Sequence, residues 1–469
     1  MLFNSLVFIE LLFITFILYY QKWSLKHQVL ILIIASLFFY AYNNPALLLL
    51  LLFSASINVL SSYYVAYGNI SNKKIIATLG VVFNLTVLAF FKYSPLISKS
   101  LFNENSSLGE FLLTIPLPIG ISFYTFEGIS LLVDVFKANK KGDKSLANIS
   151  FKEHSKNTLF FISFFPHLVS GPILKAHDFL PQIQYKYFKD IDWEKCFKTL
   201  VLGYFLKMVV ADNLKDYTFN IAFPYFETYT AITLITLLFG YSCQIFADFA
   251  GYSLIAIGIA QLFGYNLINN FNFPYISSSV QEFWKRWHIS LSSFLMEYLY
   301  FPLGGNRKGK VRTYFNLMLT MFLGGLWHGA AWSYAIWGLV HGSALAIERL
   351  FKDIIKLKPN KIFIFLKRIL VFCLVTFAWL FFKLPEFSQV VEYVKTIFNT
   401  MSLIYYSKLC YNILLYSSPV FLYHLFYLLK QNKKFNSFFE KFSFILYGIL
   451  LFLILTNSGS SGSFIYFQF

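Results

Sequence analysis

Charged side chains are scarce in this sequence. Of its 469 residues, 13% are Asp, Glu, Lys or Arg, whereas a soluble globular protein has about 25%. Hydrophobic residues make up 57% and aromatic residues 21%. Such a chain lacks the polar groups that cover a surface facing water, which excludes a soluble globular protein. The composition predicts an integral membrane protein.

Acidic residues are the scarcer of the two charge types. There are 22 of them against 39 Lys and Arg, which gives a formal net charge of +17. In a soluble chain this surplus would suggest nucleic-acid binding. Here the basic residues lie in short loops beside apolar segments, as in the cytoplasmic loops of membrane proteins. We therefore predict no nucleic-acid partner.

The sequence has only four cysteines, with no CxxC pair and no metal-binding spacing. We expect small buried residues or free thiols, and no metal or prosthetic group. The N-terminus lacks a basic n-region and a small-residue cleavage site, so its apolar segment is expected to stay as a first span. The cysteines are Cys196, Cys243, Cys373 and Cys410.

Apolar segments long enough to cross about 30 Å of hydrocarbon recur along the whole chain. Pro and Gly punctuate two of them, so 117–136 is expected to be kinked or partly re-entrant and 157–173 to lie partly in the interface. Segment 231–263 suits one tilted helix or a broken pair. We predict one all-α domain over 1–469 with about eleven or twelve crossings. The predicted spans are 2–20, 28–42, 45–67, 75–93, 117–136, 157–173, 196–211, 231–263, 313–327, 332–347, 362–383, 413–429 and 442–456.

Basic residues fall in alternate loops of this topology. The loops after the first, third and fifth spans are basic, and the loops between them are tiny or mixed in charge. By the positive-inside rule we expect both termini outside the cytoplasm. Two later loops are also basic and are expected inside. Their basic residues are Arg349, Lys352, Lys356, Lys358 and Lys361, and then Lys430, Lys433, Lys434 and Lys441.

Unusual residues concentrate between 244 and 349. The stretch QIFADFAGYS places Asp248 among apolar neighbours. The stretch QEFWKRWHISLSSFLMEYLYFPLGGNRKGK is too polar to cross a bilayer, yet its apolar residues recur at helical spacing over 283–299. This pattern predicts an interfacial helix with Lys285 and Arg286 reaching water. The helix is either a membrane anchor alone or one that presents His288 to an internal cavity.

The stretch LGGLWHGAAW places His328 in a predicted span among Gly and Ala residues. Small residues let backbones or a ligand approach closely, and an ionisable group in a membrane is costly unless it is used. Imidazole also suits proton transfer near neutral pH. A histidine hydrogen-bonded between helices is the structural alternative. His341 and His167 lack the glycine surround and are expected to be structural.

Carboxylates also lie within predicted spans, at Glu10, Glu127 and Asp134. Such groups can serve proton or ion pathways. A proton-coupled transporter or flippase therefore stays open as the non-enzyme alternative.

Several motifs resemble the membrane-bound O-acyltransferase (MBOAT) family. They are EFWKRWHISLS, YFPLGGNR and GGLWHGAAW, in that order, with LPIGISFYTF, FFPHLVSGPI and DFAGYSLIAIGIAQLFGY. The similarity is greatest to the bacterial branch that modifies alginate, peptidoglycan or teichoic acids. It implies a ring of tilted helices, with interfacial or re-entrant helices, around a funnel that brings donor and acceptor to one histidine. By motif match this is His328; His288 matches a second family histidine, and Asp248 an acidic position that helps to shape the site.

The resemblance implies an O-acetyltransferase with His328 as general base. The implied donor is cytoplasmic acetyl-CoA, and the implied partner is an extracytoplasmic SGNH/GDSL-type O-acetyltransferase or esterase-like protein that acetylates peptidoglycan, the cell-wall acceptor. Alginate or another exopolysaccharide is the alternative acceptor. Against alginate, this chain has FLMEY where the alginate-type pattern is closer to WLRDY, and Leu254 where an acidic residue follows GYS.

The sequence closes on an aromatic segment, FIYFQF, over 464–469. We expect 457–469 to be an extracytoplasmic tail with a flexible TNSGSSGS approach. The resemblance implies an acyl carrier, because a similar motif in the D-alanyl transfer systems has a tyrosine that carries the acyl group. Tyr466 has the only hydroxyl in FIYFQF and is the expected carrier. The alternative is that it only anchors the segment at the membrane interface.

Overall fold

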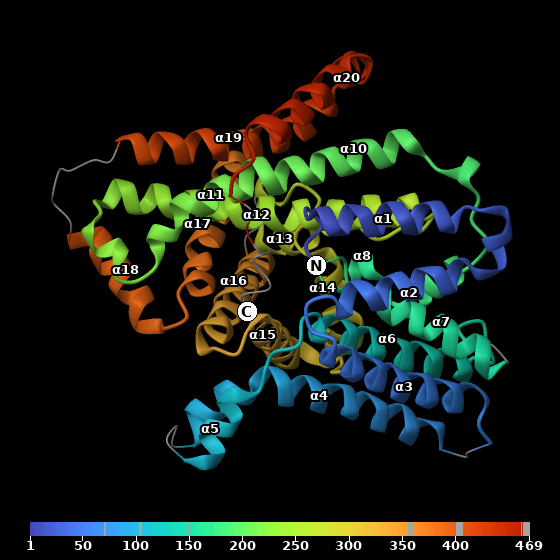
Figure 1. The fold of residues 1–469 in the computed structure, drawn as a ribbon. Helices are drawn as coiled ribbons and strands as arrows, with labels where there is room; N and C mark the ends of the chain where they lie inside the picture. Colours follow the sequence, from blue (N-terminus) through green and yellow to red (C-terminus); the bar gives the residue numbers. More distant parts are fainter. Residues whose placement is uncertain are drawn as a thin grey trace. The chain divides into compact units, whose positions relative to one another are not determined.

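The structure, a computed structural model, describes residues 1–69, 72–102, 106–147, 150–169, 171–354, 360–399, 407–460 and 462. These residues form helices and connecting loops, without a strand among them. Figure 1 shows the helices coloured along the chain. The expected all-α fold is confirmed. The chain divides into two compact units, described here one at a time.

The first unit comprises Met1–Phe197 and Ile255–Ile268. Helix α3 packs against α4, α6 and α7, and α2 packs against α1 and α7. Gly120, in the left-handed region at φ 79°, precedes α6 and lets the chain turn into it. The helices are α1 Leu6–Tyr19, α2 Gln28–Ala41, α3 Ala46–Tyr67, α4 Lys73–Leu101, α5 Ser107–Thr114, α6 Ile121–Lys140, α7 Phe151–Ser163, α8 Phe165–Leu168 and α9 Ala176–Phe179.

Helix α6 forms the core of this unit and is buried along most of its length. Asn58 of α3 and Asn84 of α4 exchange side-chain hydrogen bonds of 3.2 and 2.8 Å beside it. A Cβ on Gly128 would lie 2.6 Å from the Asn58 amide, so glycine is what lets α6 approach this pair. Small residues and paired amides hold helices together where the surroundings are apolar.

The embedded carboxylates of α6 each face a histidine. Glu127 Oε1 lies 2.8 Å from Nδ1 of His167, and both side chains are fully buried. Asp134 Oδ2 lies 2.7 Å from Nδ1 of His177, which is partly exposed. Buried charge in a membrane protein is stabilised by such pairing. Glu10, in contrast, is exposed on α1.

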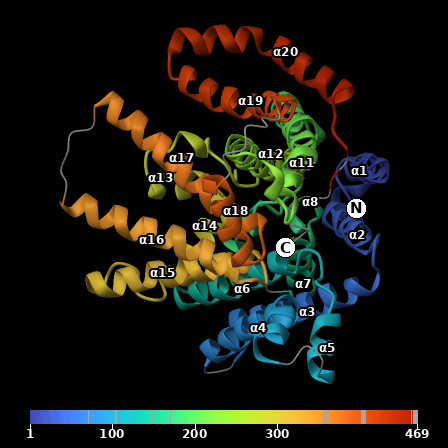
Figure 2. The ribbon, with the colours of Figure 1, turned by 90° about the vertical axis from the view of Figure 1, so that its left-hand side faces the viewer.

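The second unit comprises Lys198–Leu254 and Asn269–Phe469. Helix α15 packs against α16, α16 against α17, and α19 against α11 and α20 (Figure 2). Helices α10 and α12 each contribute residues to both units. The helices are α10 Trp193–Tyr204, a π-helix Phe205–Ala211, α11 Asp212–Thr218, α12 Ala231–Leu262, α13 Val280–Arg286, α14 Ile289–Leu295, a π-helix Met296–Tyr300, α15 Gly309–His328, α16 Trp332–Ile354, α17 Lys361–Lys383, α18 Phe387–Asn399, α19 Ser407–Lys430 and α20 Lys433–Thr456.

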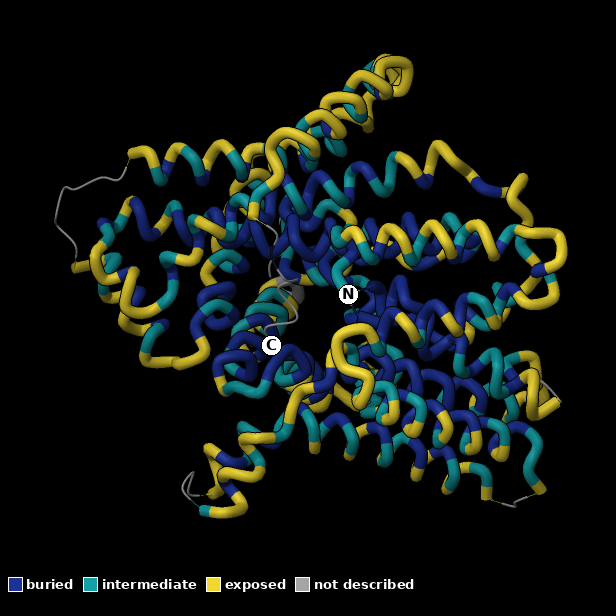
Figure 3. Tube along the Cα trace, in the orientation of Figure 1, coloured by how far each residue is buried: buried dark blue, intermediate teal, exposed yellow. Residues whose placement is uncertain are grey.

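Among the described residues, seven helical segments are long and apolar enough to cross a membrane. The chain is a multi-pass membrane protein. Segment 231–263 forms one helix, α12, in which 83% of an apolar 18-residue window is buried, whereas only 11% of the corresponding window of α20 is buried (Figure 3). The other predicted spans are mostly helical, but their helices are shorter or more polar, and 157–173 is divided between α7, which ends at Ser163, and α8, which ends at Leu168. The seven are Lys22–Ala41, Ala46–Tyr67, Lys73–Leu101, Ala231–Leu262, Lys361–Lys383, Ser407–Lys430 and Lys433–Thr456.

Candidate active site

Glycines bring the backbones of α15 and α16 into direct contact. A Cβ on Gly325 would lie 2.2 Å from the carbonyl oxygen of Tyr334, and one on Gly338 would lie 2.2 Å from that of Met321. Any larger residue would push the two helices apart. The glycine surround of His328 therefore has a packing role, since it fixes where the end of α15 lies against α16.

His328 is the last residue of α15 and is 3% exposed. Its ring lies 5.1 Å from Trp337 of α16 at 86° and 5.0 Å from Phe382 of α17 at 68°. Aromatic edges and faces on two sides hold the imidazole in one orientation. A titratable ring fixed in this way is a candidate for proton transfer.

His288, the second motif histidine, lies close to His328. The two ring centroids are 6.3 Å apart, and His288 is fully buried with Phe249 edge-on at 4.6 Å. Burial lowers the pKa of His288 to about 3, so its imidazole is neutral at pH 7. Phe249 is the residue after Asp248, so the stretch QIFADFAGYS contributes to this site through the contact of Phe249 with His288.

The expectation of one interfacial helix over 283–299 is wrong. The chain forms α13 and α14, which are separated at His288, where φ is 43°. Asn270 holds this break: its carbonyl oxygen accepts from Ile289 N at 3.0 Å, and its Oδ1 accepts from Ser290 Oγ at 2.6 Å. A non-glycine residue in this region is strained and persists only when its surroundings hold it there. Trp287 faces the protein core instead of the membrane interface, at 1% exposure.

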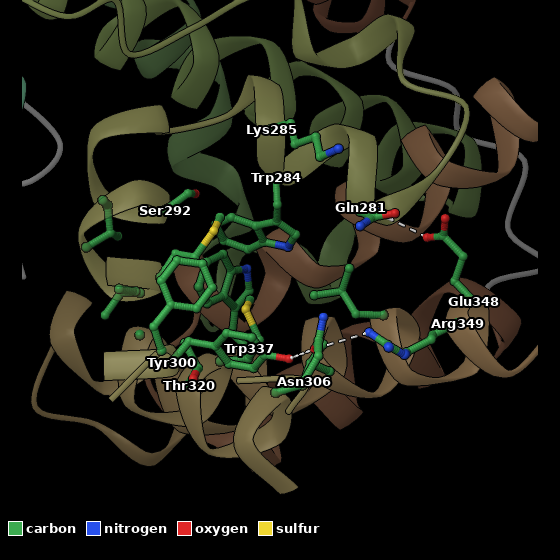
Figure 4. A pocket seen from close by; sticks show the side chains of 18 of the residues that line it. Gln281, Trp284, Lys285, Ser292, Tyr300, Asn306, Thr320, Trp337, Glu348 and Arg349 are labelled. Carbon is green, nitrogen blue, oxygen red and sulfur yellow. Dashed lines mark hydrogen bonds between the residues drawn. The ribbon is translucent and has the colours of Figure 1, made fainter. Parts of the chain in front are cut away.

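A cavity of about 740 Å³ reaches His328 within the second unit. This volume lies in the range of small-molecule sites, about 300–1,000 Å³. Its inner wall is apolar and includes Leu291, Leu295 and Met321. Figure 4 shows the indole rings of Trp284 and Trp337 and the side chain of Tyr300 turned toward this space. His328 is therefore accessible to a ligand that fills the cavity.

The outer part of the cavity is polar and charged. Glu348 of α16 accepts hydrogen bonds from the backbone N–H groups of Val280 and Gln281, at 2.7 and 3.1 Å, and so ties α13 to α16. Arg349 donates to Asn306 at 3.5 Å (Figure 4), and both residues are exposed, so we take this part of the lining as the opening of the cavity. Lys285 also lines this part. A ligand with an anionic head and an apolar end would match the two parts of the cavity.

A buried ionic cluster joins Asp248 to two residues that the sequence did not single out, Lys207 and Asp212. Lys207 Nζ is 2.7 Å from Oδ1 of Asp212 and 2.7 Å from Oδ1 of Asp248, and all three side chains are at most 4% exposed. Burial raises the pKa of Asp212 to about 6, against the opposing effect of Lys207. The sequence signal for this cluster was Lys207, which lies inside predicted span 196–211, because a charge within a membrane span needs partners of opposite charge.

Two candidate residues remain, His341 and Tyr466. His341 is buried between Trp337 and Trp284, at ring distances of 4.7 and 5.2 Å, and does not line the cavity. Tyr466 lies outside the described residues. Within the described part of the chain, no group of three or more His, Cys, Asp or Glu is placed to hold a metal ion. All four cysteines are free.

The sequence profile of MBOAT, the membrane-bound O-acyltransferase family, matches residues 29–385. The chain belongs to this family. Both histidines and the whole cavity lie inside the matched range. In this MBOAT chain His328 lines the cavity, and His288 lies behind it with its ring 6.3 Å from that of His328.

Three relatives illustrate the similarity. A probable alginate O-acetylase AlgI of Azotobacter vinelandii is 41% identical over 65% of this chain and 59% of its own length. A peptidoglycan O-acetyltransferase of Helicobacter pylori is 34% identical over 72% of this chain and 67% of its own. A teichoic acid D-alanyltransferase of Bacillus subtilis is 28% identical over 64% of this chain and 75% of its own. The chain thus matches about three fifths of the length of the alginate protein.

Proposed function

We propose that this MBOAT chain is a membrane O-acetyltransferase that moves an acetyl group from acetyl-CoA to an extracytoplasmic acceptor. The observation that carries the proposal is the placement of His328, fixed between aromatic rings at the end of a cavity with an apolar interior and a charged opening. Relatives named for acyl transfer to peptidoglycan, alginate and teichoic acid support this class of reaction.

The proposed first step attaches the acetyl group to the chain itself. The phenol oxygen of Tyr466 attacks the thioester carbonyl while His328 takes the phenol proton. The carbon–sulfur bond then breaks, and the departing thiolate receives that proton from His328. The indole N–H groups of Trp284 and Trp337, which line the cavity, are the proposed donors to the developing oxyanion. The products are a tyrosine acetyl ester and free CoA, and the step needs no net proton uptake.

The proposed second step passes the acetyl group outward. An SGNH/GDSL-type O-acetyltransferase or esterase-like partner takes it from the tyrosine ester and esterifies a hydroxyl of peptidoglycan. By the positive-inside rule we expect the cavity opening, beside Arg349, on the cytoplasmic side, where the donor is found. By the same rule we expect Tyr466, which follows α20 in the sequence, on the opposite side.

Arg349 is expected to bind the phosphate groups of the donor at the cavity opening. Arg349→Ala should raise the KM for acetyl-CoA about tenfold and leave kcat nearly unchanged, because the guanidinium would contact the donor equally in ground and transition states. The measurement is the rate of CoA release by purified protein at varied acetyl-CoA concentration.

Arg312→Ala is the matched control for this prediction. Arg312 is also an arginine outside the membrane core, on the first turn of α15, but it stacks on Phe315 and does not line the cavity. Its removal should leave KM unchanged. An Arg349→Ala variant whose KM equals that of wild type would place the donor phosphates elsewhere.

Peptidoglycan is the proposed acceptor, and muropeptide analysis tests it. Deletion of the gene should remove O-acetyl groups from muropeptides, and re-expression of the wild-type chain should restore them, as read by chromatography and mass spectrometry before and after mild alkali. Unchanged muropeptides together with lost acetate from an exopolysaccharide would instead support the alginate-type acceptor.

A further inference from the structure

The chain that follows α20 returns to α11 and the π-helix before it, and is hydrogen-bonded to both. Asn213 donates to the carbonyl oxygen of Asn457 at 3.0 Å, and the backbone N–H of Gly459 donates to the carbonyl of Met208 at 2.9 Å. Tyr416 of α19 donates to Oδ1 of Asn457 at 3.3 Å. These bonds hold the backbone of the returning segment and are independent of most of its side chains.

Two charged side chains of α11 hold the next residue of this segment. Lys215 Nζ donates to the carbonyl oxygen and the Oγ of Ser460, both at 3.2 Å. Ser460 Oγ in turn donates to Asp216 at 3.0 Å. We call Asn213, Lys215 and Asp216 the α11 clamp.

The returning segment can pack closely against α11 because glycines lie at its points of closest approach to that helix. A Cβ on Gly459 would lie 2.6 Å from the backbone nitrogen of Asn213, and one on Gly462 would lie 2.9 Å from Lys215 Nζ and 3.2 Å from Asp212 Oδ1. Backbone atoms cannot move aside as a flexible side chain can. In contrast, a Cβ on Gly448 of α20 would meet nothing within 4 Å.

The clamp lies beside the buried ionic cluster. A Cβ on Gly462 would lie 3.2 Å from Asp212 Oδ1, and Asp212 is bridged by Lys207 to Asp248 of α12. Phe249, the residue after Asp248, has its ring 4.6 Å from that of His288, and the rings of His288 and His328 are 6.3 Å apart. Helix α12 therefore contacts both the ionic cluster beside the clamp and the histidine pair, inside the second unit.

We propose that the α11 clamp is a docking site for the chain's own segment 457–462, and that its residues position Tyr466 for reaction at His328. The proposal rests on the carrier role proposed above for Tyr466. Tyr466 is four positions after Gly462, and an extended chain of four residues spans at most about 14 Å. A fixed Gly462 therefore keeps the tyrosine within that distance of the clamp, at an effective concentration of about millimolar or more.

The test compares acetylation of the chain's own Tyr466 with acetylation of a free peptide. Purified full-length protein is incubated with acetyl-CoA, and the ester on Tyr466 is followed by mass spectrometry. In parallel, the peptide SFIYFQF, which is residues 463–469, is supplied in trans. Gly459→Val should slow acetylation of its own Tyr466 at least tenfold and leave acetylation of the peptide unchanged, whereas Gly448→Val should change neither.

A second variant covers the case in which Gly459→Val disturbs folding. The double substitution Lys215→Ala and Asp216→Ala removes partly exposed side chains, so it should fold normally. It should slow acetylation of Tyr466 several-fold and leave the peptide reaction intact.

Three results would overturn the clamp. The first is equal acetylation of Tyr466 in Gly459→Val and Gly448→Val. The second is a parallel loss of both reactions in well-folded variants of either kind, which would show a purely structural role. A third, distinct result is a wild-type protein that forms no ester on Tyr466 while the polymer is still acetylated. That result overturns the carrier role itself, and the clamp with it.

Discussion

His328→Gln is expected to lower O-acetylation of the polymer by about 10²–10⁴-fold, the usual contribution of a general base. Glutamine keeps much of the volume between Trp337 and Phe382 but cannot accept a proton near neutral pH. The binding of acetyl-CoA should be retained, because the charged opening of the cavity is unchanged. The measurement is ester content per muropeptide, with the amount of variant in the membrane fraction determined by immunoblot.

His341→Gln is the matched control, since it makes the same substitution thirteen residues later on the adjoining helix. His341 is fully buried against Trp284 and Trp337 but does not line the cavity. Its loss should affect thermal stability as much as the loss of His328 or more, yet leave the acetylation rate within about threefold of wild type. Normal polymer acetylation by His328→Gln would overturn the role of His328 as general base.

Dependence on a proton gradient separates the enzyme from a proton-coupled transporter. In the proposed chemistry the proton that His328 removes from the hydroxyl returns to the thiolate, so turnover moves no net charge and should not depend on a proton gradient. A transporter would require one. Each embedded carboxylate of α6 also lies 2.7–2.8 Å from a histidine nitrogen. This pairing stabilises both carboxylates inside the protein and accounts for them without a proton pathway.

Local sequence patterns predicted the helices and one residue of the site. Apolar runs of membrane length place α2, α3, α4, α12, α17, α19 and α20 where the structure has them. His328 was identifiable because its glycine neighbours and its position in a span are properties of a short window. Such features do not depend on which distant segments pack together.

Features that depend on distant contacts were not predictable in this way. The break at His288 exists because Asn270, eighteen residues earlier, binds the backbone on its far side. Periodicity alone therefore merged α13 and α14 into one helix. The cluster of Lys207, Asp212 and Asp248 joins α12 to the π-helix that precedes α11, and the α11 clamp joins residues some 245 positions apart. No pattern in a single sequence encodes such pairings.

Tyr466→Phe is expected to reduce acetyl transfer to the polymer to background, a loss of about a hundredfold or more. The change removes only the hydroxyl and keeps the aromatic ring, so any binding of FIYFQF to an apolar surface is preserved. A phenol with a pKa near 10 is protonated at pH 7 and needs a base to attack a thioester. The carrier role therefore predicts that Tyr466→Phe and His328→Gln have the same phenotype in polymer acetylation.

Tyr411→Phe is the matched control, because Tyr411 is an exposed tyrosine of α19 and should tolerate loss of its hydroxyl. The decisive comparison uses the peptide SFIYFQF. Tyr466→Phe keeps its general base, so it should still acetylate the peptide, whereas His328→Gln should not. Full polymer acetylation by Tyr466→Phe would leave the tyrosine only an anchoring role, and the acceptor hydroxyl would then have to reach His328 directly. The two variants together thus separate the group that carries the acetyl from the group that moves the proton.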